Sequence, residues 1–198
     1  SKFGGRFKYS KVLNVIDDVD RSITSNITRV RVRRNLRALI NQEAQYELCF
    51  GNRFHVNSGG FNIKSTGFRI INEPDIVYLT DIPNSDGRTG VLSIVKPIQE
   101  TGENRVVIKS AGLVDYVKGE VILTTVLITD TVLADDIIEV QAFPESNDVV
   151  GLKDLYLEFD VSKSTINMIK DTISSGEKIS GVGFKVTSSY SNGELKRG

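Results

Sequence analysis

The spacing of hydrophobic residues changes from helical to strand-like between the first helix and residue 34. Near the N-terminus hydrophobic residues recur every three or four positions, which predicts an amphipathic helix with one apolar stripe. The stripe consists of Tyr9, Val12, Leu13, Ile16 and Val19. The helix should end at the acidic residues 17–20, because the helix macrodipole disfavours carboxylates at a C-terminus. From residue 27 the spacing becomes two, which predicts a strand with valines on one face and Arg29, Arg31 and Arg33 on the other.

Most of the remaining chain shows strand patterns separated by turn signals such as Asn-Gly-rich or Asp-Gly stretches. A second helix is predicted near 165–175, with Ser164 as its N-cap and Gly176 as its stop. The predicted strands span 46–50, 61–70, 75–80, 91–97, 105–110, 120–129, 136–143, 155–161 and 181–189. The expected fold class is therefore α+β: strand-rich, with mostly antiparallel sheets, a short N-terminal helix and the helix near 165–175.

The pattern also suggests a division of the chain. Residues 1–40 should form a helix–strand segment that packs onto a β-rich body of residues 41–198, with a possible break into two subdomains near 97–112. Because the chain starts at Ser1 without a methionine and ends at Gly198, we expect it to be a piece of a longer protein. The family resemblance described below implies that this piece is a C-terminal fragment.

The strand at 120–129 is hydrophobic on both faces, which is typical of a strand in the middle of a buried sheet or at a subunit interface. Strict alternation places Val121, Leu123 and Leu127 on one face and residues 122, 126 and 128 on the other. Val121, Leu123 and Leu127 are the apolar candidates for an interface, and Arg29, Arg31 and Arg33 are the charged ones. The next strand follows after a short turn, which predicts a hairpin or meander.

Charge and composition exclude several classes of partner. Lysines and arginines balance acidic residues at 25 each, so the chain as a whole has no electrostatic attraction to nucleic acid or to an anionic membrane. The longest apolar run is too short to span a bilayer. A single cysteine, Cys49, excludes an intramolecular disulfide and fits synthesis in a reducing compartment.

Candidate catalytic chemistry is sparse. His55 is the only histidine and is expected to be structural, while Cys49 is expected to be a small buried side chain rather than a nucleophile. The pairs Asp17–Asp18 and Asp135–Asp136 fit solvated turns better than a metal site. No glycine-containing stretch matches a phosphate-binding loop or a dinucleotide fingerprint. We therefore expect no enzyme activity, no cofactor, no metal and no small-molecule substrate.

The row of arginines permits three interpretations. A nucleic-acid-binding β domain could use the arginine strand 29–37 to follow phosphates, and its affinity would then fall steeply with salt. However, no aromatic residues alternate with these arginines to stack on bases. A solvent-facing strand paired with carboxylates explains the pattern better, and a protein–protein contact explains it better still, since arginine is enriched at interfaces.

Three long strings carry a resemblance to a known family: KYSKVLNVIDDVDRSITSNITRVRVRRNL, PESNDVVGLKDLYLEFD and KVTSSYSNGEL. They resemble the C-terminal region of the large baseplate wedge proteins of T-even-type contractile-tailed bacteriophages, the products of gene six. The resemblance covers essentially all of the chain. A more remote similarity, in the helix followed by a V-x-V strand, is to baseplate J-like proteins.

The resemblance implies a structural late protein of the virion, placed in the tail baseplate and assembled in the host cytoplasm. Such a protein would form a homodimer, contact other wedge proteins and join neighbouring wedges into the inner baseplate ring. That ring would relay the contraction signal to the sheath. It implies no nucleic acid, membrane or small-molecule partner.

Overall fold

The structure is a computed structural model that describes residues 5–98, 101–152, 157–169, 190–191 and 194–195. Contacts between Cα atoms divide the chain into two units, residues 1–159 and residues 160–198. The division predicted from the sequence, with segments 1–40 and 41–198 and a break near 97–112, stays a prediction.

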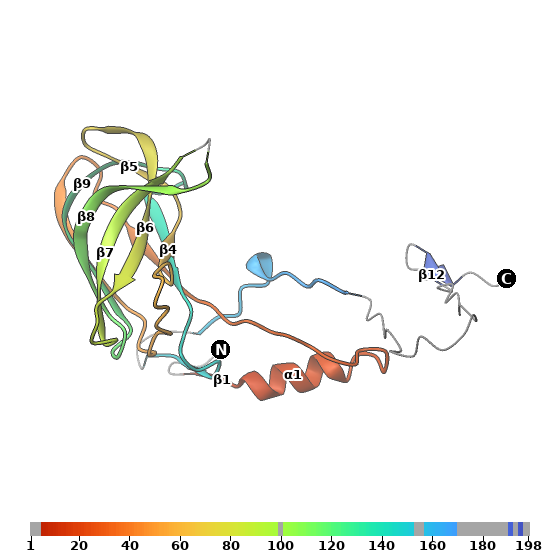
Figure 1. The fold of residues 1–198 in the computed structure, drawn as a ribbon. Coiled ribbons are helices and arrows are strands. Elements are labelled where there is room, and N and C mark those ends of the chain that lie inside the picture. Colours follow the sequence, from red (N-terminus) through yellow and green to blue (C-terminus); the bar gives the residue numbers. More distant parts are fainter. Residues whose placement is uncertain (1–4, 99–100, 153–156, 170–189, 192–193, 196–198) are drawn as a thin grey trace, which may run out of the picture. The chain divides into compact units, whose positions relative to one another are not determined.

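Five antiparallel strands of the first unit close into a barrel (Figure 1). They are β5 (Phe68–Ile70), β6 (Glu73–Pro83), β7 (Thr89–Pro97), β8 (Asn104–Asp115) and β9 (Glu120–Thr131). Each pairs with the next, and β9 pairs with both β8 and β5, so the ring of strand pairings is complete. Closure of this kind leaves no unpaired edge in the ring.

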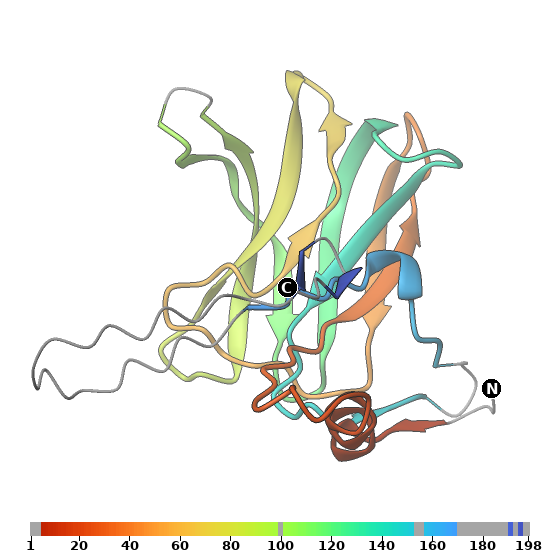
Figure 2. The same cartoon turned by 90° about the vertical axis from the view of Figure 1, so that its right-hand side faces the viewer.

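Other strands of the first unit extend this arrangement. The strand β3 (Glu43–Cys49) also pairs with β9, outside the ring. A separate three-stranded sheet has β10 (Ile137–Ala142) between β2 (Val32–Arg37) and β4 (Lys64–Ser65), and its strands can be followed in Figure 2. The remaining elements are β1 (Arg6–Phe7), α1 (Tyr9–Asp17), β11 (Val149–Val150), the 3₁₀ turn η1 (Val161–Lys163), β12 (Tyr190–Ser191) and β13 (Glu194–Leu195).

The helix α1 confirms the sequence prediction closely. It ends at Asp17, where the acidic run begins. Four of the five predicted stripe residues are partly buried, whereas Val19 lies beyond the helix and is exposed. The Tyr9 hydroxyl donates a hydrogen bond to the carbonyl oxygen of Thr28, which links the start of the helix to the segment before β2.

One continuous hydrophobic core joins the barrel to the three-stranded sheet. Alternate residues along each barrel strand point inward, as the spacing of two predicts. Among the largest fully buried side chains are Phe54, Ile63, Phe68, Leu92, Ile94, Tyr116, Leu123, Ile128 and Ile138.

A buried polar network fixes the loop before β4 to the barrel. Asp81, fully buried in β6, accepts a hydrogen bond from the Tyr116 hydroxyl at 2.6 Å and one from the backbone N–H of Ile63 at 2.7 Å. The backbone oxygen of Asp81 accepts a further bond from Phe61 N–H. A buried carboxylate is tolerated only when its oxygens are satisfied in this way. The network therefore ties three distant segments of the chain together.

The predicted fold class, α+β, was wrong. Strands make up 47% of the described residues and α1 is their one α-helix, so this part of the chain is mostly β. The helix predicted near 165–175 is not formed over residues 165–169, and residues 170–175 lie outside the described part. Ile166, Met168 and Ile169 are all more than four-fifths exposed. A short helix is marginal in water without a packed apolar face, which explains the failure.

Two predictions about β9 and its neighbour were also wrong. Val121 and Leu123 point into the core, Thr124 and Thr125 are both exposed, and Val126 is buried again. This β-bulge, where two residues of β9 oppose one of β3, reverses the alternation and puts Leu127 on the opposite face from Val121 and Leu123. The expected hairpin with the next strand does not form, because β10 pairs with β2 and β4 instead.

The predicted strand 61–70 was wrong, because this stretch forms two short strands, β4 and β5, that belong to different sheets. The remaining strand predictions of the first unit are confirmed with shifted ends. The predicted strand 181–189 and residues 155–156 of the strand 155–161 lie outside the described residues, and residues 157–160 carry no regular secondary structure.

We expect the Tyr116→Phe substitution to lower the free energy of unfolding by about 1–3 kcal/mol at neutral pH, because it removes a donor from a buried carboxylate. Burial, the hydrogen bond to Asp81 and the negative charge of Asp81 all raise the pKa of Tyr116. A raised pKa in the folded state means that stabilisation is complete below pH about 10, where free tyrosine ionises, and is lost as the pH rises further. Denaturant unfolding across this pH range should therefore show a weaker alkaline loss in Tyr116→Phe.

The matched control is Tyr78→Phe, which alters a partly buried tyrosine of β6 outside this network. Tyrosinate absorbance should show Tyr116 resisting ionisation as the pH rises above about 10. Equal stability of Tyr116→Phe and Tyr78→Phe would contradict the importance of the network.

Candidate interaction surfaces

The arginines of the predicted strand lie on one exposed side of the segment that leads into β2. The strand itself begins at Val32, five residues later than the pattern predicted. The alternation is nevertheless confirmed, because Arg29, Arg31 and Arg33 are exposed while Val30 is partly buried and Val32 is buried.

The three arginines have different surroundings. Arg33 forms an ion pair of 2.6 Å with Glu139 of β10, whose side chain is only 6% exposed. Arg31 lies over the ring of Phe143, 4.9 Å from its centroid, and donates to the side-chain oxygen of Gln141. Arg29 has no hydrogen bond or ion pair with any described residue. Of the three arginines, Arg33 thus has a structural role and Arg31 stacks on an aromatic ring. Arg29 is free of such contacts within the described residues and can bind a partner.

A groove of about 360 Å³ opens beside Arg29. Residues Thr28, Arg29 and Val30 line it together with segments that follow β3 and β10. The groove brings Arg29 and the single histidine, His55, into one lining, and both are exposed. Phe61 and Phe143 also line it, and none of the described residues that line it carries a carboxylate. Sequence patterns missed this groove because its residues are far apart in the chain and none of its segments carries a local motif.

The groove is held open by a buried amide. The side chain of Asn62 donates to the carbonyl oxygens of His55 and Phe143 and accepts from the Phe143 N–H. These hydrogen bonds hold the backbone segments of His55 and Phe143 at a fixed distance on the two sides of the groove. His55 is therefore a groove residue, on the surface rather than in the core.

A second surface is an apolar row across the outside of the barrel. Ile82, Val91, Leu113 and Ile122 are direct cross-strand neighbours on β6, β7, β8 and β9. Ile82 is 45% and Leu113 54% exposed, so the row faces solvent. Exposed apolar side chains in a contiguous group are typical of contact surfaces.

The apolar interface candidates of β9 have different accessibilities. Val121 and Leu123 are each 1% exposed and belong to the core of the first unit, whereas Leu127 is partly exposed on the other face. The part of β9 accessible to a partner in this conformation is thus the face of Ile122 and Leu127. The role of Val121, Leu123 and Leu127 in an interface stays a prediction.

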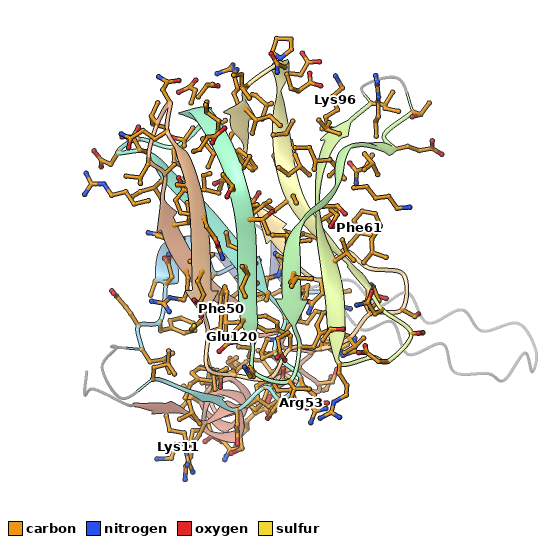
Figure 3. All side chains as sticks on the ribbon, turned by 90° about the vertical axis from the view of Figure 1, so that its left-hand side faces the viewer. Lys11, Phe50, Arg53, Phe61, Lys96 and Glu120 are labelled. Atoms are coloured by element: carbon orange, nitrogen blue, oxygen red, sulfur yellow. The ribbon has the colours of Figure 1, made fainter. Side chains whose placement is uncertain are left out.

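Three potential metal ligands come together where β3 meets β9. The side chains of Glu47, Cys49 and Glu120 place one ligand atom each within 4.8 Å of the others, and Figure 3 labels Glu120 at the start of its strand. Cys49 and Glu120 are register partners, and Glu47 lies on the same face two residues away. Exposed carboxylates often gather without a metal, and we assign none here.

Cys49 is partly buried in this cluster. Burial raises the pKa of its thiol, and the hydrogen bond to Glu47 with the negative charges of Glu47 and Glu120 raises it further, while Arg34 has a smaller opposing effect. A raised pKa keeps the thiol protonated and unreactive. The expectation that Cys49 is a small buried side chain rather than a nucleophile stays a prediction, and the structure shows Cys49 partly rather than fully buried.

These surfaces define a β-barrel unit equipped for contacts, with the groove, the arginines and the apolar row as the features that distinguish its surface. Residues 1–35 match a family model described as "Baseplate structural protein gp6, C-terminal domain III". The match covers α1 and the arginines that lead into β2, 35 of the 198 residues, and shows that this part of the chain is similar to that domain. No curated protein matches the chain. The comparisons give no support to the more remote similarity to baseplate J-like proteins.

The Arg33→Leu substitution should lower the free energy of unfolding by about 1–3 kcal/mol, because it removes a charged hydrogen-bond partner from the buried Glu139. The Arg29→Leu substitution should change it by less than about 0.5 kcal/mol, as expected for a surface site. Denaturant unfolding of both variants checks this difference. Equal effects of the two substitutions would show that the Arg33–Glu139 pair does not stabilise β2 against β10.

Alkylation of Cys49 by iodoacetamide at mildly alkaline pH should be slower than that of a small free thiol, because less thiolate is present. Replacing Glu47 with glutamine removes a negative charge and should accelerate the reaction. The control is Glu43→Gln, an exposed position earlier on the same strand. A rate that does not respond to Glu47→Gln would mean that burial alone protects the thiol.

Proposed function

We propose that the chain is a structural subunit of a phage tail baseplate wedge. The observation that carries this proposal is the family match over residues 1–35, which includes the helix and the arginines that lead into β2. The match favours a structural role over an enzymatic one. The described residues support it with surfaces suited to contacts: an arginine row, an open groove and an apolar row on the barrel.

In this proposal the protein forms a homodimer, contacts other wedge proteins and joins neighbouring wedges into the inner baseplate ring. The ring relays the contraction signal to the sheath. The protein is assembled in the host cytoplasm and resides in the virion, in the tail baseplate. A closed barrel suits a relay of this kind, because a ring of paired strands with a packed interior transmits displacement with little internal change.

The contacts proposed for self-association are Arg29 and Arg31, the apolar row and the exposed face of β9 with Leu127. Arg33 supports this surface indirectly, since its pair with Glu139 holds β2 against β10. Val121 and Leu123 contribute from the inside, by packing the strand that presents Leu127.

The alternative of a nucleic-acid-binding domain that uses residues 29–37 stays a prediction. Arg33 and Arg31 are engaged by Glu139 and Phe143 within the chain, which leaves fewer cations for phosphates. No helix in the described residues is long and apolar enough to cross a membrane.

Light scattering or sedimentation over a wide concentration range should show a dimer of the 198-residue chain. The Leu113→Glu substitution places a charge in the exposed apolar row without disturbing the core. It should raise the dimer dissociation constant by about tenfold or more, because an unpaired charge would be buried in the contact. The double substitution of Arg29 and Arg31 by glutamate should have a similar effect.

Arg105→Glu is the matched control, because Arg105 is exposed on β8 and has no ion pair with a described residue. A chain that is monomeric at all concentrations would contradict a self-sufficient dimer contact in this fragment. Loss of dimer in Arg105→Glu as well would point to net charge rather than to a defined surface.

A further inference from the structure

The groove arises where β2 and β10 separate. The two strands pair from Arg37 to Val32, where Ala142 of β10 is the last partner. After Ala142 the chain pairs with the segment of Phe54 and His55 instead of with β2. The Phe143 carbonyl accepts a hydrogen bond from the His55 N–H at 2.9 Å, and Pro144 forms a β-bridge with Phe54. Phe143 gives its own N–H to Asn62. The residues before Val32 consequently lose their strand partner.

This leaves an open backbone edge beside the groove. Because the Ala38 N–H bonds to the Asp136 oxygen, the even-numbered residues of β2 turn their backbone groups toward β10. Val30 is the next even-numbered residue, and within the described residues its N–H donates no hydrogen bond. Arg29 and Arg31 turn their N–H groups to the outer edge of β2 instead. The sequence nevertheless has strand alternation over exactly this segment, and the alternate burial of Val30 and Val32 confirms it. Residues 29–31 are therefore arranged like part of a strand whose neighbour is missing. An unpaired edge of this kind can be extended by a strand from another chain.

The chemistry of the groove favours an acidic occupant. Arg29 and His55 line it, and Arg31 is held over the Phe143 ring at its border. Within the part of the chain that the structure describes, no acidic residue lines the groove. Arg29 and His55 have no side-chain partner among the described residues, so both can bind a ligand. An isolated cationic groove attracts carboxylates and excludes basic segments.

The groove also presents a strained aromatic residue. Phe61, labelled in Figure 3, has a φ of 65° and a side chain that is 46% exposed. A bulky residue with positive φ is uncommon and must be held by its surroundings. Here the Phe61 N–H donates to the backbone oxygen of Asp81, and the Asn57 side chain donates to the carbonyl of Gly60. The loop thus holds an apolar ring at the groove, where it can contact a hydrophobic side chain.

We propose that this groove binds an extended acidic segment of a partner protein, which adds as a strand to the open backbone edge at residues 29–31. Its carboxylates pair with Arg29 and His55, and its alternate apolar side chains pack on Phe61. The unpaired backbone favours a polypeptide over a nucleic acid, because only a polypeptide can supply both donors and acceptors in strand register. This proposal depends on the proposed assembly role in one respect: it takes the partner to be a protein.

The probe for the test is a capped hexapeptide of alternating glutamate and valine, added to the 198-residue chain at a concentration where light scattering shows one oligomeric state. The signals of the His55 ring are unambiguous in the NMR spectrum because it is the only histidine. We expect a saturable shift of these signals and slower hydrogen exchange at the amide of Val30, whose backbone groups face the side that β10 leaves open. The Arg29→Glu substitution should weaken binding by about tenfold, the effect of reversing a charge at a contact.

Three controls decide the outcome. Arg105→Glu should bind the peptide as the unchanged chain does. A peptide with N-methyl groups on alternate residues should lose the slowed exchange, because it cannot pair along that edge. A peptide of alternating lysine and valine should not bind.

Binding that is equal in the chain and in Arg29→Glu, or equal for the acidic and basic peptides, would overturn the proposal. Saturable binding of a short single-stranded oligothymidylate in place of the peptide, lost in Arg29→Glu, would assign the groove to nucleic acid instead. A dimer detected by light scattering while the peptide fails to bind would leave the assembly role intact and remove only the groove from it.

Discussion

The architecture of the first unit depends on the backbone pairing of one strand, β9. It forms ladders with β3, β5 and β8, so the barrel closes and β3 is attached through a single strand. β3 and β5 pair with successive stretches of β9, and the bulge at Thr124–Thr125 shifts the register within the ladder with β3. The turn that leads into β9 is equally constrained. Gly119 has a φ of 70°, and a Cβ there would lie 1.9 Å from the backbone oxygen of Asn52.

The sequence predicted local structure well wherever one period extended over a whole element. The end of α1 at Asp17 and most strands of the barrel belong to this group. The sequence-based prediction failed where pairing between distant strands determined the local structure. No local pattern distinguishes a bulge in β9 from a continuous strand, since threonines are common in both. A helical pattern at 165–169 likewise has no effect when its apolar residues find nothing to pack on.

The candidate interaction surfaces depend even more on contacts between residues that are distant in the sequence. Alternation located the arginines and their exposed face correctly, but it could not distinguish Arg33, Arg31 and Arg29 by their partners. Glu139, Phe143 and His55 lie between about 25 and 110 residues away in the chain, and β10 brings two of them to the arginines. The lone histidine was interpreted as structural because sequence alone gives a residue no distant neighbours. Its position in the groove follows from the hydrogen bonds of Asn62, a buried amide that no pattern singles out.

The separation of β2 from β10 links the fold to a function in assembly. A sheet that stays paired to its end offers a partner only side chains, whereas a sheet whose last residues are unpaired also offers backbone donors and acceptors. Backbone pairing is directional and fixes register, so it can position a neighbour without a large apolar area. Balanced net charge fits this mode of contact, because electrostatic attraction is then local. The groove beside Arg29 and His55 provides it, since no acidic residue among the described ones lines that groove. The strand pattern that continues past the end of β2 into residues 29–31 is then best understood as half of a pairing that a partner completes.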